Sequence, residues 1–312
     1  MVRKLIRLLG PLLFLLILSR MDLARMAEII IAIKLHFLLA ALLLYPCLIL
    51  LKAWRWRILL SQQEINYGLT PAFLTYNSSL GAGYVTPGRL GEFMKALYLR
   101  QDEGIPLGQA LSSVVMDRLF DLYLLLMTAG LGITLFSLPG QLSAIALGVL
   151  LAAGLAPLLI LVPDVSRRVI ALFIKALSLM KGTRYGEEIK LTLSHFQQGM
   201  EQLLNIHLQF PLLVTIMAYA LFYLQCYLTA LALQLPLSYP YAAFCVSLAS
   251  LLALLPISIS GLGVRDATFI ALLLPLGVTA EMAVSYSLLI LLVFNVFGGA
   301  WGAMAWFTKP LK

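Results

Sequence analysis

A group of charged side chains lies between residues 81 and 121, in a chain whose apolar segments otherwise carry few charges. Its members are Arg89, Glu92, Lys95, Arg100, Asp102, Glu103, Asp117, Arg118 and Asp121. An arginine guanidinium binds phosphate through two parallel hydrogen bonds. A carboxylate can offset such an arginine or bind an amine. These residue types therefore favour the binding of a charged, phosphate-bearing group.

A weaker copy of this pattern lies at residues 256–283. Each copy has a proline, a glycine-rich turn with one arginine and one acid, and later a Gly-Ile or Gly-Val pair. The first copy holds Pro87, Gly88, Arg89, Gly91, Glu92 and Gly104-Ile105. The second holds Pro256, Gly261, Gly263, Arg265, Asp266 and Gly277-Val278. Two polar elements broken by Gly and Pro in corresponding places indicate an internal repeat, and in transporters such segments mark the binding site.

We predict that the bound group contacts residues of both copies. These residues are Arg89, Glu92, Asp117, Arg118, Asp121, Arg265 and Asp266. The turns are expected to be shaped by Pro87, Gly88, Gly91, Pro256, Gly261 and Gly263. If the copies converge on one ligand, Arg118 and Arg265 face one cavity. A second interpretation stays open, in which the same charges form a structural ion-pair network that ties broken helices together.

The composition indicates the environment in which this chemistry takes place. The chain is 62% hydrophobic and only 12% charged, whereas soluble domains carry about 25% charged residues. Several apolar runs exceed the roughly 18 residues that cross a bilayer. We therefore predict an all-α polytopic membrane protein, with a single membrane domain over residues 1–312.

The remaining composition excludes other classes of function. The net charge of +8 comes from basic residues beside the spans, as the positive-inside rule expects. No basic patch interleaved with aromatic residues supports nucleic-acid binding. The three cysteines and three histidines are scattered, without the spacing of a metal site. We predict no metal and no cofactor. No Gly-x-x-x-x-Gly-Lys-Ser/Thr loop indicates ATP hydrolysis.

Six spans and two shorter elements are expected to position the charges. The spans are residues 8–18, Leu35–Leu51, Leu111–Leu138, Gln141–Val162, Phe210–Leu233 and Ala280–Phe307. Leu69–Tyr84 and Tyr239–Pro256 are short and polar, which favours re-entrant segments inside the protein. Asp22–Lys34 and Asp164–Ile206 have the spacing of amphipathic helices on a membrane surface. The alternating Trp and Arg residues of Lys52–Arg57 favour a headgroup anchor, with a substrate role as the alternative.

The basic residues also predict the orientation. With both termini in the cytoplasm, Arg55, Arg57 and the basic connection at about 163–208 lie inside, as expected for a cytoplasmic (inner) membrane. The first repeat, at about 35–138, and the second, at about 209–308, then have opposite orientations. Inverted repeats of this kind are the architecture of alternating-access carriers.

At these residues the chain resembles a known family. TPGRLGE (Thr86–Glu92), DRLFD (Asp117–Asp121) and PISISGLGVRD (Pro256–Asp266), followed by Gly277-Val278, are similar to motifs of the lysylphosphatidylglycerol synthase transmembrane family, also called flippase-like proteins. The resemblance covers nearly the whole chain. It departs from the usual pattern where Ser260 and Asp266 replace a glycine and a glutamate.

The resemblance implies a lipid flippase that moves a phospholipid or polyprenyl-type lipid between leaflets, with an anionic headgroup as the bound group. It does not imply synthesis of aminoacyl lipids, because the soluble aminoacyl-transferase domain of the synthases is absent. We therefore expect no enzyme. Two alternatives stay open: a membrane-embedded lipid-phosphate transferase with Asp117 or Glu92 as base, and a non-transporting partner of a separate lipid-modifying enzyme.

Overall fold

Four long apolar helical segments dominate the protein. The computed structural model describes residues 14–136, 147–148, 151, 183–204, 208–254 and 261–311. The segments long enough to cross a membrane in these ranges are α3 (Leu35–Gln62), α6 (Leu107–Phe136), α10 (Gln209–Ala232) and Ala280–Thr308. Every regular element in the described ranges is a helix. The prediction of an all-α polytopic membrane protein is therefore confirmed.

Two of the six predicted spans fall largely outside the described residues. These are residues 8–18 and Gln141–Val162, so the number of spans stays a prediction. The predicted bounds of the other four lie close to observed helices, except at the end of α3.

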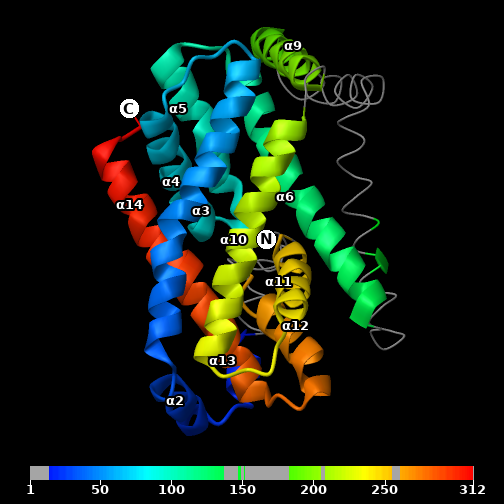
Figure 1. The fold of residues 1–312 in the computed structure, drawn as a ribbon. Coiled ribbons are helices and arrows are strands. Elements are labelled where there is room, and N and C mark those ends of the chain that lie inside the picture. The colour runs from blue at the N-terminus through cyan, green and yellow to red at the C-terminus, as the bar shows by residue number, and fades with distance from the viewer. Residues whose placement is uncertain are drawn as a thin grey trace.

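Shorter helices connect the spans. They are α2 (Leu23–Ile31), α4 (Leu69–Val85), the 3₁₀ segment η1 (Pro87–Phe93), α5 (Met94–Glu103), α9 (Thr183–Leu204), α11 (Tyr239–Ala253), α12 (Val264–Leu273) and the 3₁₀ turn η2 (Leu274–Leu276). The last span consists of α13 (Ala280–Ile290), the π-helical turn η3 (Leu291–Phe297) and α14 (Gly298–Thr308). Figure 1 shows α4 and α5 in the upper half of the bundle and α11 and α12 in the lower half.

The two predicted amphipathic segments contain helices. Asp22 is the N-cap of α2: its carboxylate accepts hydrogen bonds from the backbone N–H groups of Ala24 and Arg25. Helix α9 packs closely against α6, because at Gly108 a Cβ atom would meet the backbone of Thr192. Their position on a membrane surface stays a prediction.

Helix α3 is longer than the sequence suggested. The predicted span ended at Leu51, followed by a headgroup anchor, but the helix continues to Gln62. Arg55 and Trp56 are fully buried in the protein, so the anchor interpretation is wrong for these two residues. The physical reason is that carboxylates of α6 neutralise the Arg55 side chain inside the bundle. Arg57 is exposed.

The described helices form two sets with the same order and nearly the same lengths. Helices α3, α4 and α5 correspond to α10, α11 and α12, and α6 corresponds to the last span, from α13 to α14. Corresponding boundaries lie 170 residues apart: α3 ends at Gln62 and α10 at Ala232, α4 begins at Leu69 and α11 at Tyr239, α5 begins at Met94 and α12 at Val264. The three residues of η2 then shift the start of α6 at Leu107 to that of α13 at Ala280.

The turn after the first helix of each set has the same backbone geometry. Glu64 has a φ of 61° and Gln234, at the corresponding position, a φ of 56°. Residues other than glycine rarely adopt this left-handed backbone conformation. An equivalent contact also recurs between helices: Trp56 donates to Ser113, and Tyr286 donates to the carbonyl of Cys226. The internal repeat is thus visible in local geometry that has no sequence signature.

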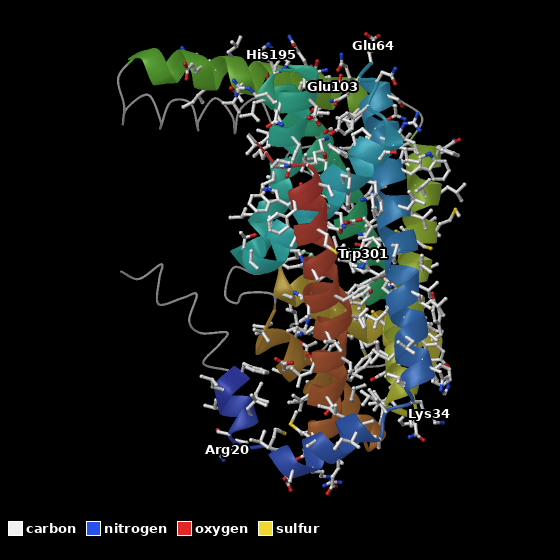
Figure 2. The ribbon with its side chains drawn as sticks, turned by 90° about the vertical axis from the view of Figure 1, so that its left-hand side faces the viewer. Arg20, Lys34, Glu64, Glu103, His195 and Trp301 are labelled. Atoms are coloured by element: carbon white, nitrogen blue, oxygen red, sulfur yellow. The ribbon has the colours of Figure 1, made fainter. Side chains whose placement is uncertain are left out.

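The two sets run in opposite directions. Figure 2 shows Lys34, before α3, near the end of the bundle where Arg20 lies, and Glu64, after α3, at the other end with Glu103 and His195. In Figure 1, α10 starts beside α9 at the upper end and runs to the lower end. The placement of α4 and α11 in a membrane as re-entrant elements stays a prediction.

Each set also packs its last helix against the other set. Helix α14 lies along α4, and α6 lies along α11. Small residues allow both crossings: a Cβ atom on Gly302 would lie 2.7 Å from the Cα atom of Gly81, and one on Gly132 would meet the ring of Phe244. Close approach at small residues is the usual way in which membrane helices associate.

We expect Gly302→Ala to destabilise the protein by about 1–3 kcal/mol, the usual effect of overpacking. Gly299→Ala is the matched control on the same helix, because a Cβ atom there meets nothing within 4 Å. The control should be neutral or stabilising, since alanine favours a helix over glycine. Thermal unfolding in detergent measures both variants, and equal melting temperatures would contradict the close crossing of α4 and α14.

Candidate functional site

Asp117 of α6 lies at the centre of a buried charge cluster. Its Oδ1 accepts two hydrogen bonds from the Arg55 guanidinium, at 2.7 and 2.9 Å. Its Oδ2 accepts from Lys95 Nζ at 2.6 Å and from the Tyr76 hydroxyl at 3.1 Å. All four side chains are buried. Asp117 therefore joins α3, α4, α5 and α6 at one point.

Asp121 and Glu92 extend this cluster. Asp121 lies one helical turn beyond Asp117 and pairs with Lys52 at 2.9 Å and with Arg55 at 2.8 Å. Glu92 pairs with Arg118. We call this set the buried ion network: Lys52, Arg55, Glu92, Lys95, Asp117, Arg118 and Asp121. It contains four cations and three carboxylates, so its carboxylates are already engaged.

Lys52 and Arg55 were predicted to belong to a headgroup anchor and not to the site, and Lys95 was given no role. A signal was present for the first two. Lys52 and Arg55 are three residues apart, so they share one face of an apolar helix. Charged residues inside a membrane helix almost always face a partner or a polar cavity, and the acids on α6 were the available partners.

A pocket lies between the two sets of helices. Thr86 and Arg89 line it from the first set, and Ser250, Arg265 and Asn295 from the second. We call it the central pocket; its volume is about 50 Å³. The Arg265 side chain is buried, and its Nε donates to Ser287 Oγ at 2.8 Å. Its Nη2 has no hydrogen-bond partner.

A second pocket adjoins the central pocket. Arg89 lines both, as do Phe222, Ser250 and Phe294, and Lys52 lines the second pocket. No carboxylate of the described residues lines either one. Arg89 is about half exposed and lies 4.0 Å from Glu92, which is a weak ion pair. The two pockets therefore form a cationic cavity suited to an anion.

Two details of the predicted site are wrong. The pocket that Arg265 lines is lined by Arg89 and not by Arg118, because Arg118 is held by Glu92 in the ion network. The assumed correspondence between Arg89 and Arg265 is also shifted. Each of Lys95 and Arg265 is the second residue of its short helix, α5 or α12, so Lys95 is the true counterpart of Arg265.

Asp266 has a local structural contact. Its Oδ2 accepts a hydrogen bond from the backbone N–H of Gly263 at 2.7 Å, which caps the first turn of α12. The side chain is fully buried. The carboxylate thereby holds the turn that presents Arg265.

The predicted turn residues include several with unusual backbone angles. Gly88 has a φ of 61°, and Gly261 and Gly263 have φ values of 76° and 80°. Arg89 also has a φ of 56°, and strained residues of this kind cluster at ligand sites. Gly91 acts differently, because a Cβ atom there would clash with the backbone of Ala82. Pro87 begins η1, and Pro256 lies outside the described residues.

A second polar cluster holds the C-terminal end of α14. Lys309 Nζ contacts Asp102 and lies 2.6 Å from the Tyr67 hydroxyl. Tyr67 donates to Asp102 at 2.5 Å. Burial raises the pKa of the Tyr67 hydroxyl, so it stays protonated and able to donate. This cluster lies outside the two pockets and fixes α14 to the end of α5.

A comparison with known families shows the family of this chain. A family model described as "Lysylphosphatidylglycerol synthase TM region" matches residues 5–302. The chain belongs to this family. No curated protein and no solved structure matches the chain. Membership shows a membrane protein linked to lipid metabolism. Described residues of each of the three motifs, such as Arg89, Asp117 and Arg265, lie in the ion network or line the central pocket.

We expect Asp117→Asn to destabilise the protein by about 3–5 kcal/mol, because Arg55 and Lys95 would each lose a buried ionic partner. Glu103→Gln is the control, since Glu103 is an exposed acid at the end of the neighbouring helix α5. The melting temperature in detergent should fall for Asp117→Asn and stay unchanged for Glu103→Gln. A stable Asp117→Asn protein would show that the network does not hold these helices together.

Proposed function

We propose that this protein moves a lipid with an anionic headgroup, a phospholipid or a polyprenyl-type lipid, between the two leaflets. One observation carries the proposal. Arg265 is buried, its Nη2 lacks a hydrogen-bond partner, and it shares with Arg89 a pocket that no carboxylate of the described residues lines. Leaving a buried charge without a partner is costly, so an anion from outside the chain is its natural partner.

The arrangement of the helices supports transport. The central pocket lies between two sets of helices that run in opposite directions (Figure 1). Transporters with inverted repeats bind their substrate at such an interface and expose it to each side in turn. A headgroup phosphate between Arg89 and Arg265 would touch one residue of each set. Such a ligand could stay bound while the two sets of helices move relative to each other and open the pocket to one side of the membrane and then the other.

The contacts of the buried ion network favour a structural role for it rather than a catalytic one. Asp117 accepts hydrogen bonds from Arg55, Lys95 and Tyr76, so it is not free to act as the base of a transferase. Among the described residues, no group of His, Cys, Asp and Glu side chains could hold a metal ion. The proposed role of the network is to hold α3 to α6 in place while Arg89 and Arg265 meet the headgroup.

The test uses the purified protein in vesicles that contain fluorescent phosphatidylglycerol. Quenching from outside measures the rate at which the label crosses the bilayer. We expect Arg265→Gln to slow this rate roughly tenfold or more, because a charge-assisted hydrogen bond contributes about 1.5–3 kcal/mol. Arg100→Gln, which removes an exposed arginine on α5, is the matched control. Wild-type rates in a folded Arg265→Gln protein would refute the proposal.

A double variant tests whether both arginines bind one phosphate. Arg89→Gln and Arg265→Gln should each weaken lipid binding roughly tenfold, where each tenfold step equals about 1.4 kcal/mol. The double variant should lose less than the sum of the two free energies, because the residues share one ligand. Strictly additive losses would instead indicate two separate binding sites.

In the proposed orientation, the protein lies in the cytoplasmic (inner) membrane with both termini on the cytoplasmic side. Glu188 on α9 and Ser238 before α11 are both exposed. After replacement of the native cysteines, Glu188→Cys should react only with a reagent on the cytoplasmic side, and Ser238→Cys only with one outside. Labelling of both positions from the same side would contradict the inverted orientation of the two sets.

A further inference from the structure

A third cavity lies between α4 and the end of the last span. Its volume is about 430 Å³, within the range of small-molecule sites. The lining comes from α4, from Met94 at the start of α5, from η3 and from α14: Ser78, Gly81, Ala82, Tyr84, Val85, Met94, Asn295, Val296, Gly299, Gly302, Ala303 and Trp306. None of these residues carries a charge. We call this cavity the lateral groove.

Small residues create the space in the groove. Gly81 and Gly302 bring α4 and α14 into direct backbone contact. Gly299 lies one turn before Gly302, and a Cβ atom there would meet nothing within 4 Å. The two helices therefore touch at one level and leave a gap beside Gly299. The gap is a feature of the backbone, because no side chain has to move to form it.

The groove adjoins both cationic pockets and also lies at the surface. It shares Asn295 with the central pocket and Tyr84 with the pocket that Lys52 lines. Four of its apolar residues are exposed: Val85, Val296, Ala303 and Trp306. In Figure 2, α14 lies at the front of the bundle. Asn295 lies on the π-helical turn η3, and such turns are frequent at functional sites.

We propose that the lateral groove binds one hydrocarbon chain of the lipid whose anionic group lies between Arg89 and Arg265. This inference rests on the proposed function. It assigns a site to the hydrocarbon chain of the lipid, whereas the cationic pockets would hold its charged group. A lipid joins a charged group to an apolar chain, and here an uncharged groove adjoins a cationic cavity at Asn295 and Tyr84.

The chemistry of the lining favours a hydrocarbon chain over a second polar ligand. Apolar surface removed from water or packed against protein gains free energy in proportion to its area. The amide of Asn295 lies where the groove meets the central pocket, at the level where the polar linkage of a lipid would follow its phosphate. Acyl and polyprenyl chains share this chemistry, so phosphatidylglycerol and a polyprenyl phosphate are both suitable probes.

The test fills the groove without disturbing the charges. Gly299→Leu places a side chain in open space, so the protein should fold. We expect its affinity for dioleoyl phosphatidylglycerol in detergent to fall about tenfold, while its affinity for glycerol phosphate, which has no chain, stays unchanged. Gly299→Ala controls for the loss of a helix glycine. Ala300→Leu controls for added bulk, because Ala300 is exposed and does not line the groove.

The outcomes separate this inference from the proposed function. Arg265→Gln should weaken the binding of both the lipid and glycerol phosphate. If Gly299→Leu binds the lipid as the wild type does, or if Ala300→Leu weakens it equally, the groove does not hold a chain, and the headgroup site still stands. If Arg265→Gln binds both probes normally, the proposed function fails first. The same series with a polyprenyl phosphate shows which type of chain loses affinity.

A photochemical measurement checks the location directly. Phosphatidylglycerol with a diazirine near the end of one acyl chain should attach, on irradiation, to peptides of α4 or α14. Attachment in Gly299→Leu should drop at least severalfold, with no drop in Ala300→Leu. Labels spread over the outer faces of α3 and α10, unchanged by Gly299→Leu, would overturn the inference.

Discussion

The carboxylate of Asp117 is the constraint on which the upper half of the bundle depends. Inside an apolar bundle, an ionised carboxylate is tolerated only if cations reach it directly. Arg55 comes from α3, Lys95 from α5 and the Tyr76 hydroxyl from α4. The segment between α4 and α6 must therefore fold back far enough to bring Lys95 beside α6. The 3₁₀ turn and the left-handed Gly88 and Arg89 make that return possible.

The second half has the same helices without this network. The counterpart of Arg55 is Gln225, which donates to the carbonyl of Ala41. The counterpart of Lys95 is Arg265, and the position equivalent to Asp117 is Ile290, which lines the central pocket. Where the first half places an acid, the second half places an apolar side chain next to an arginine. The two halves thus share the order of their helices and differ in whether an acid stands at this position of the long helix.

The sequence predicted what depends on composition and local pattern. Apolar runs indicated the spans, and Gly and Pro indicated the two broken elements, because these signals act within a few residues. It did not predict which charges meet. Arg55 lies 62 residues from Asp117, and the interfacial pattern around Trp54 and Trp56 offered a simpler explanation. Comparison of the two sequence motifs also paired Arg89 with Arg265, because both are arginines in a glycine-rich turn. The starts of α5 and α12 show that Lys95 is the residue that corresponds to Arg265.

The difference between the two halves supports the proposed ligand site beside Arg265. In the first half, Lys95 is neutralised by Asp117, and α6 continues as one unbroken helix past that point. In the second half, α13 ends at Ile290 and the π-helical turn follows directly. The turn carries Asn295 to the junction of the central pocket and the lateral groove. The half with an apolar residue at the position of Asp117 is also the half whose long helix is irregular, so the Arg265 Nη2 without a hydrogen-bond partner and the space for a ligand occur together.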